Sequence, residues 1–210
     1  MSDDVLNVIL IVFLFSAFGI SHSFLASGSV KKILIAKLGD LIAFYRFIYV
    51  VLSLFLFYII YMLIPDNYLI VFDLKPPFDI LVLIPQFAGL AGFFWTLKYF
   101  SVKEFLGINQ IVRWYNHNYD TEEFDEHLTL RIAGPYKFCR HPLYFFSIVF
   151  LLFRPEMNLN YLTLLICISV YFYIGSFYEE KKLVEKFGGK YLSYQKKVPR
   201  ILPVKLRLFK

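Results

Sequence analysis

Long blocks of apolar residues, separated by short polar stretches, dominate this sequence of 210 residues. Within each block the apolar positions are continuous rather than alternating, which favours α-helices over the strands of a closed barrel. A helix needs roughly 20 apolar residues to cross a hydrocarbon core of about 30 Å. The pattern therefore predicts an all-α integral membrane protein with about five transmembrane helices. The predicted spans are residues 5–25, 41–64, 78–100, 142–153 and 160–177.

The last two predicted spans are short for a full crossing, and a polar link of residues 154–158 separates them. A link this short predicts an antiparallel helical hairpin, in which both helices lengthen by recruiting flanking residues. The loop at residues 101–141 is too small and too polar to form a hydrophobic core of its own. A polar tail follows the last span at residues 178–210. We therefore expect a single membrane domain over residues 1–210.

The composition agrees with this class, because 59% of the residues are hydrophobic and only 18% are charged. Soluble domains are nearer 45–50% apolar and about 25% charged. The first span is predicted to be retained rather than cleaved as a signal peptide, since Asp3 and Asp4 stand where a basic region belongs and the apolar run is too long. The two cysteines, Cys139 and Cys167, predict no disulfide, and they show no metal-ligand spacing with the histidines.

Lysine and arginine concentrate in the loops on one side of the predicted spans. They follow the first and third spans and fill the tail, whereas the opposite loops carry only Lys75 and Arg154. The positive-inside rule therefore predicts the N-terminus outside and the C-terminus in the cytoplasm. The lack of a signal or retention motif favours a bacterial inner membrane, with the endoplasmic reticulum as the eukaryotic counterpart. The net charge of +6 favours anionic lipid headgroups, and no nucleic-acid-binding module is present.

Two polar stretches are predicted to meet at the cytoplasmic end of the hairpin. Residues 134–144, GPYKFCRHPLY, precede the fourth span, and residues 178–180 follow the fifth. Either stretch alone is typical of interfacial anchoring or of a solvated helix face. Because the hairpin returns the chain to the same side, polar groups from both stretches should lie within reach of one site. That site would contain Arg140, His141, Tyr144, Glu179 and Glu180.

The predicted tail begins with the end of a helix, and a surface segment follows it. Gly188 and Gly189 are expected to end the helix that extends from the fifth span. A short amphipathic segment with tyrosines follows, closed by Val198-Pro199-Arg200. It predicts a helix lying on the membrane surface, or a lid over the mouth of the site.

Together these motifs resemble the isoprenylcysteine carboxyl methyltransferase superfamily of membrane methyltransferases. The resemblance covers residues 134–203 in order: the Gly-Pro-Tyr and Arg-His-Pro-Leu-Tyr motifs, the Glu-Glu pair, and the Phe-Gly…Tyr…Tyr…Val-Pro-Arg tail. Weaker similarities at residues 21–32, 45–49 and 104–107 resemble the bacterial branch that includes methanethiol S-methyltransferases and NnrU-like proteins.

The resemblance implies S-adenosylmethionine as cofactor and a small or lipophilic acceptor, such as a thiol, a lipid headgroup or a prenyl-like carboxylate. A carboxylate such as Glu180 suits the cofactor's cationic groups, and Arg140 or His141 suits its carboxylate. The resemblance also implies catalytic roles for Glu180 and Arg200. The implied cofactor-binding residues are Gly134, Pro135, Tyr136, Arg140, His141, Tyr144, Glu179 and Glu180.

Two residues depart from simple expectation. Phe146 stands where the family commonly has glycine, two residues after the motif tyrosine. His22 lies at the cytoplasmic end of the first span, where it is predicted either to contact the substrate or to cap or snorkel from the helix.

Other functions stay open on the sequence. A non-catalytic membrane factor of the NnrU-like kind fits the bulky Phe146 and the lack of an obvious base. An NADPH-dependent membrane reductase shares an Arg-His-Pro-x-Tyr element, but Leu143 and the residues after Tyr144 differ from its usual pattern. A transporter fits less well, because the middle of each span lacks buried carboxylates or lysines.

Overall fold

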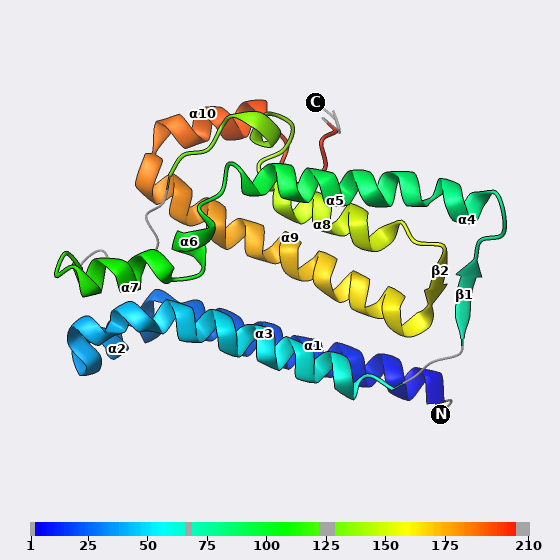
Figure 1. Ribbon diagram of the computed structural model, residues 1–210, viewed down its shortest axis with the longest axis horizontal. Helices are drawn as coiled ribbons and strands as arrows, with labels where there is room; N and C mark the ends of the chain where they lie inside the picture. The colour runs from blue at the N-terminus through cyan, green and yellow to red at the C-terminus, as the bar shows by residue number, and fades with distance from the viewer. Residues whose placement is uncertain (1–2, 66–68, 122–128, 205–210) are drawn as a thin grey trace. The chain divides into compact units, whose positions relative to one another are not determined.

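The computed structural model describes residues 3–65, 69–121 and 129–204. Residues 122–128 of the predicted loop and 205–210 of the predicted tail lie outside this range. Most described residues are helical (Figure 1). The elements are α1 (Asp3–Ala26), α2 (Gly28–Leu38), η1 (Gly39–Phe44), α3 (Tyr45–Leu63), β1 (Ile70–Asp73), α4 (Phe78–Leu81), α5 (Leu83–Leu97), α6 (Val102–Phe105), α7 (Ile108–Tyr115), η2 (Gly134–Lys137), α8 (Pro142–Leu152), β2 (Glu156–Asn158), α9 (Leu159–Phe187) and α10 (Gly189–Lys197).

Four helical segments within the described residues are long and apolar enough to cross a membrane. This confirms the predicted class, a mostly helical multi-pass membrane protein. The segments are Asp3–Ala26, Gly28–Leu63, Phe78–Leu97 and Leu159–Phe187.

The predicted fourth span is shorter than a crossing helix. Helix α8 has 11 residues, which at about 1.5 Å per residue cover roughly half of a 30 Å core. It ends because Phe153 is extended and Pro155 follows two residues later. Helix α9 does lengthen as expected, to Phe187, and Gly188 ends it with a φ of +53° and an N–H that donates to the Val184 carbonyl.

The described residues form two compact units, and one of them combines α1, α2, η1 and α3 with α6 and α7. In this unit α1 packs against α3, where the rings of Phe18 and Phe57 lie 5.9 Å apart. The Arg46 side chain donates a 2.8 Å hydrogen bond to the Phe105 carbonyl and so joins α3 to α6. The short helix η1 contacts both α2 and α7.

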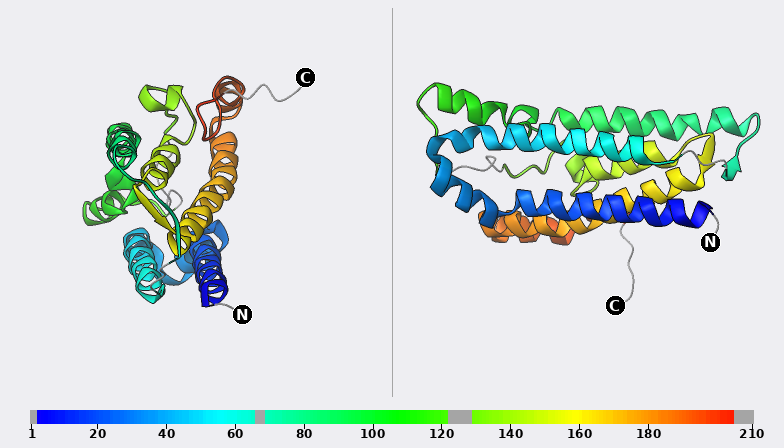
Figure 2. Two further views of the ribbon diagram at one scale, coloured as in Figure 1. Left: turned by 90° about the vertical axis from the view of Figure 1, so that its right-hand side faces the viewer. Right: turned by 90° about the horizontal axis from the view of Figure 1, so that it is seen from below.

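The other unit contains β1, β2, α4, α5, η2, α8, α9 and α10. Helices α5 and α8 lie side by side in it (Figures 1 and 2). Glycines allow this approach, because a Cβ on Gly89 would stand 2.8 Å from the Phe150 nitrogen and one on Gly92 would overlap the Phe146 ring. The spacing of the two glycines places them on one face of α5.

A two-stranded antiparallel ladder, which the all-helical expectation did not include, joins the link before α9 to an earlier segment. It pairs Ile70 with Asn158 and Asp73 with Glu156. Asn158 then caps α9, since its side chain accepts a 2.8 Å hydrogen bond from the Tyr161 nitrogen. The α8–α9 connection is therefore fixed by backbone pairing as well as by its short length.

Candidate functional site

The Glu180 carboxylate on α9 is the centre of an enclosed ionic network. Arg140 binds it in a bidentate manner, with Nε 2.8 Å from Oε1 and Nη2 3.1 Å from Oε2. His141 Nε2 lies 3.1 Å from Oε1, while Gln195 and Arg200 donate to Oε2 at 2.8 and 3.2 Å. Glu180 is only 3% exposed, and a carboxylate buried to this degree requires such partners. We call these five residues the Glu180 network.

The same arginine also holds the tail. Arg140 Nη1 donates to the carbonyls of Gln195 and Val198 at 2.9 and 3.0 Å. The last carbonyls of a helix lack partners within it and favour a cation, so Arg140 caps the end of α10. The backbone nitrogens of Arg140 and His141 also donate to the Arg200 carbonyl, each at 3.0 Å. The described part of the predicted lid is thus fastened to the α8–α9 hairpin.

His141 connects the buried network to an exposed neighbour. Its Nδ1 lies 3.1 Å from Glu179 Oε2, and the Glu179 side chain is 52% exposed. Burial alone lowers the pKa of His141, but the hydrogen bonds and charges of Glu179 and Glu180 outweigh it and raise that pKa above its ordinary value. With a carboxylate at each ring nitrogen, the protonated imidazole donates on both sides.

Tyr144 forms the middle of an aromatic stack beside these carboxylates. Its ring lies parallel to His141 at 5.3 Å and to Phe172 at 4.4 Å. The Tyr144 ring thus stacks on two other rings, and its hydroxyl donates to Glu179. Gly175 lies between Phe172 and Glu179 on the same face of α9, and a Cβ there would stand 4.0 Å from the Tyr144 oxygen. We call Tyr144, Gly175 and Glu179 the Glu179 surface.

The remaining predicted residues of the loop, 134–136, form the turn η2. Gly134 packs directly against the Tyr99 ring, and Pro135 is buried. The Tyr136 carbonyl accepts a 2.5 Å hydrogen bond from the Tyr194 hydroxyl, while burial raises the pKa of the Tyr136 phenol. The structure thus uses this turn to join the end of α5 to α10.

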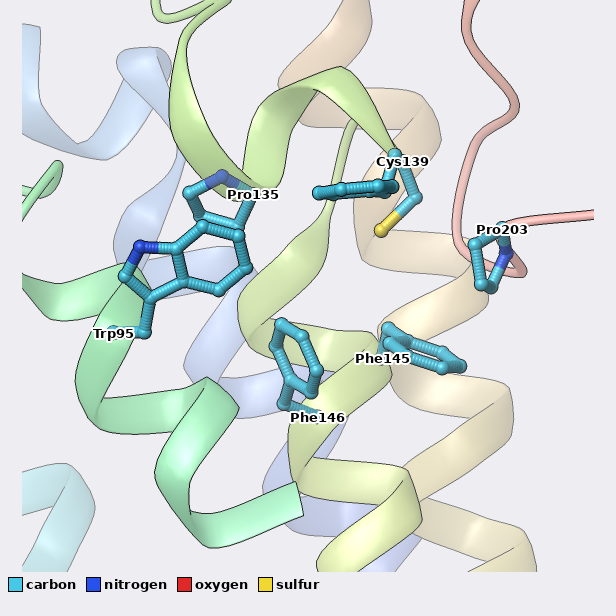
Figure 3. A pocket seen from close by; sticks show the side chains of 7 residues that line it. Trp95, Pro135, Cys139, Phe145, Phe146 and Pro203 are labelled. Atoms are coloured by element: carbon cyan, nitrogen blue, oxygen red, sulfur yellow. The ribbon is translucent and has the colours of Figure 1, made fainter. Parts of the chain in front are cut away.

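An apolar pocket of about 280 Å³ lies between the end of α5, the loop before α8, the start of α8 and the tail (Figure 3). Figure 3 shows the rings of Phe145 and Phe146 on α8 below the Cys139 thiol. Burial raises the pKa of Cys139 to about 12, so the thiol stays protonated at neutral pH. Sequence reasoning missed this pocket because its walls come from separate segments. The walls are Trp95, Pro135, Phe138, Cys139, Phe145, Phe146 and Pro203.

Phe146 faces this pocket and α5 rather than the Glu179 surface. Its ring fits over Gly92 and lies 6.5 Å from the Trp95 ring. Residues two positions apart on an α-helix point about 200° apart, so Phe146 and Tyr144 lie on different faces of α8. The bulky ring at this position therefore leaves the Glu179 surface open.

His22 belongs to the other compact unit, where it lies within a polar cluster between α1 and α3. Its Nδ1 is 2.9 Å from Ser53 Oγ and its Nε2 is 2.6 Å from Tyr49 Oη. Ser53 donates to the Tyr49 carbonyl at 2.7 Å, so its oxygen is left to accept from Nδ1–H. The spacing of Tyr49 and Ser53, four residues apart on one helix, was a signal that sequence reasoning did not use.

Comparisons with known proteins agree with the motifs. No family model and no solved structure matches the chain. The chain is 43% identical over 68 residues to a methanethiol S-methyltransferase of Pseudomonas deceptionensis, a match that covers 32% of this chain and 26% of the relative. It is 27% identical over 128 residues to methanethiol S-methyltransferase 1 of Bradyrhizobium diazoefficiens, a match that covers 61% of this chain and 43% of the relative.

A third relative, the methanethiol S-methyltransferase of a Pseudomonas species, is 38% identical over 68 residues, or 32% of this chain and 26% of the relative. The chain thus matches less than half the length of each of these three relatives. These matches confirm the resemblance to the bacterial methanethiol S-methyltransferase branch that the motifs predicted.

Proposed function

We propose that this protein is an integral membrane methyltransferase that uses S-adenosylmethionine and methylates a small thiol. The observation that carries the proposal is the meeting of the Arg-His-Pro-Leu-Tyr and Glu-Glu motifs in one ionic cluster. The similarity to relatives named methanethiol S-methyltransferase supports both the reaction and the class of acceptor.

The residues of the site divide into a frame and a contact surface. Arg140, Glu180 and Arg200 direct their charges at one another, so we assign them to holding α9, the loop before α8 and the tail in place. Glu179 and Tyr144 present a half-exposed carboxylate and a hydroxyl beside Gly175. We therefore assign the contact with the cofactor's ammonium group to the Glu179 surface.

The charged and hydroxyl groups of the Glu179 surface fit this cofactor. S-adenosylmethionine, when bound, would supply a methyl group on a positively charged sulfur. A thiol that has already lost its proton to water would form the new sulfur–carbon bond in line, and S-adenosylhomocysteine would leave as the neutral thioether. The Glu179 carboxylate would hold the ammonium group of the cofactor, and the imidazolium of His141 would fix that carboxylate in position. The protein's contribution is then orientation and exclusion of water rather than proton transfer.

The apolar pocket offers a place for the acceptor. Among the described residues its walls carry no charged side chain, so they suit an acceptor with an apolar body and disfavour one that carries an anionic group besides its sulfur. The orientation is part of the same proposal: by the positive-inside rule the N-terminus lies outside and the site opens to the cytoplasm. His22 stays a predicted substrate contact, which His22→Ala would test by its effect on the KM for the thiol.

Calorimetry on the detergent-purified protein tests the cofactor. S-adenosylhomocysteine should bind with micromolar affinity, while NADPH titrated in parallel should not bind. Binding of NADPH alone would favour a reductase, and no binding of either would favour a non-catalytic membrane factor.

Transfer of a labelled methyl group tests the acceptor. Methanethiol should be methylated, whereas 2-mercaptoethanesulfonate, a thiol with a fixed negative charge, should be a poor acceptor. Equal rates with both thiols would contradict an apolar acceptor pocket, and cofactor binding without transfer to any thiol would contradict the acceptor class.

A further inference from the structure

A second pocket, of about 400 Å³, lies in the unit formed by α1–α3, α6 and α7, and the proposed methyl transfer makes no use of it. Within the described part of the chain, its walls combine aromatic rings with one carboxylate. They are Asp40, Trp114, Tyr115, His117 and Tyr119, which we call the aromatic pocket.

The end of α7 shapes one wall of the aromatic pocket. The His117 nitrogen donates to the Trp114 carbonyl at 3.0 Å and the Asn118 nitrogen donates to the Arg113 carbonyl at 2.9 Å, the two hydrogen bonds of a Schellman motif. His117 takes the left-handed position with a φ of +56°, where glycine is usual. A side chain is thus kept at a strained position, and that side chain lines the pocket.

The helix η1 supplies both the charge and the support for the central ring. The Phe44 ring meets the Trp114 ring edge to face, with centroids 5.0 Å apart and planes at 70°. Asp40, in the first turn of the same short helix, is exposed and lines the pocket. The indole is therefore held on one side, while the carboxylate adds a negative charge to the pocket.

This combination has a specific chemical complement. Aromatic faces attract cations, and indole does so most strongly. A carboxylate among the rings adds charge attraction, and among the described residues neither lysine nor arginine lines the pocket. A hard metal ion would need several oxygen ligands rather than rings. We propose that the aromatic pocket binds a quaternary ammonium group, carried by a lipid headgroup or by a free amine.

The ordinary explanation of these rings is interfacial anchoring, since tryptophan and tyrosine gather at membrane surfaces. Anchoring requires neither the carboxylate of Asp40 nor a histidine in a left-handed turn. The test therefore has to separate recognition of charge from plain apolar contact.

Fluorescence of Trp114 gives that separation. The chain has two tryptophans, so Trp95→Phe leaves Trp114 as the only reporter. In detergent, choline should quench Trp114 with a saturable curve in the millimolar range, whereas 3,3-dimethyl-1-butanol, its uncharged isostere, should bind about tenfold more weakly. Equal binding of the two compounds, or no saturable change with choline, would overturn the proposal.

Substitutions in the same Trp95→Phe background locate the site. Asp40→Asn should weaken choline binding about fivefold, and Tyr119→Leu should weaken it about two- to fivefold. Asp79→Asn, an aspartate outside the pocket, is the matched control and should bind as the parent does. His117→Gly removes the ring while relieving the backbone, so it should weaken binding without lowering the melting temperature. Retained affinity in Asp40→Asn and Tyr119→Leu would overturn the proposal.

Nanodiscs distinguish the two sources of the ammonium group. In phosphatidylglycerol nanodiscs choline should titrate as it does in detergent. If phosphatidylcholine nanodiscs abolish the titration, the lipid headgroup fills the pocket; if the titration persists, the site takes a free amine. Loss of the choline response in both lipids would overturn the proposal.

Discussion

Glu179 and Glu180 are neighbours in sequence, yet their carboxylates lie in different environments. The Glu180 side chain is 4% exposed and faces Arg140, His141 and Arg200, whereas the Glu179 side chain is 52% exposed and faces Tyr144 and His141. Successive residues on a helix point about 100° apart, so one glutamate enters the hairpin and the other remains at its surface. The same residue type therefore serves as structural anchor at one position and as candidate ligand contact at the next.

The largest expected effect is the loss of stability when the buried Glu180 is substituted. Glu180→Gln removes the charge that compensates Arg140, Arg200 and His141, and breaking a buried ion pair costs about 3–5 kcal/mol. We expect a markedly lower melting temperature in detergent and faster proteolysis of the tail. The double variant Arg140→Met/Glu180→Met should recover much of the loss, because it leaves fewer uncompensated charges. An unchanged melting temperature in Glu180→Gln would contradict the anchor role.

The matched substitution at the surface should act on binding instead. Glu179→Gln keeps the shape of the side chain and removes a half-exposed charge, so stability should change by less than about 1 kcal/mol. Affinity for S-adenosylhomocysteine should fall about tenfold, since hydrogen bonds to a charged group contribute about 1.5–3 kcal/mol. Calorimetry and thermal melting of both glutamine variants check the comparison. If Glu179→Gln unfolds the protein while Glu180→Gln only loses ligand, the division is reversed.

The sequence predicted the place of this site but not the division between Glu179 and Glu180, since both were expected to bind the cofactor. The short link at 154–158 predicted that residues 134–144 and 178–180 would meet, and the contacts of Arg140 and His141 with Glu180 agree. The Gly188 helix end was also predictable, because glycine readily adopts the positive φ found there. These features depend on local chain geometry, which short sequence patterns can predict.

Other features could not be predicted, because they depend on which distant segments of the chain meet in the fold. The pairing of Ile70 with Asn158 joins residues far apart in sequence, and neither strand shows a distinctive pattern. The carbonyls of Gln195 and Val198 that bind Arg140 have no signature, because every residue has a carbonyl. The fit of the Phe146 ring over Gly92 was also not predictable. The sequence gives the residue at each position but not which residues of α5 and α8 face each other.

A smaller effect should follow from closing the space beside Tyr144. Gly175→Leu places a side chain next to the Tyr144 hydroxyl, where a Cβ would already stand 4.0 Å away. We expect affinity for S-adenosylhomocysteine to fall about fivefold, while the helix gains propensity over glycine by several tenths of a kcal/mol. Gly189→Leu on α10, where a Cβ would meet nothing within 4 Å, is the control and should bind normally. Equal affinity in the two variants would remove Gly175 from the binding surface.

The smallest expected effect is the pH dependence of the histidine that links the two carboxylates. The pKa of His141 is raised in the folded protein, so its ion pairs contribute stability that is fully present below the unfolded value of about 6.5. This contribution is lost as the pH rises through the raised folded pKa. Melting temperatures measured from pH 6 to 9 should therefore decline, and His141→Gln should flatten the decline because its amide does not titrate. A slope that is the same in both proteins would show that the histidine charge does not join the Glu180 network to the Glu179 surface.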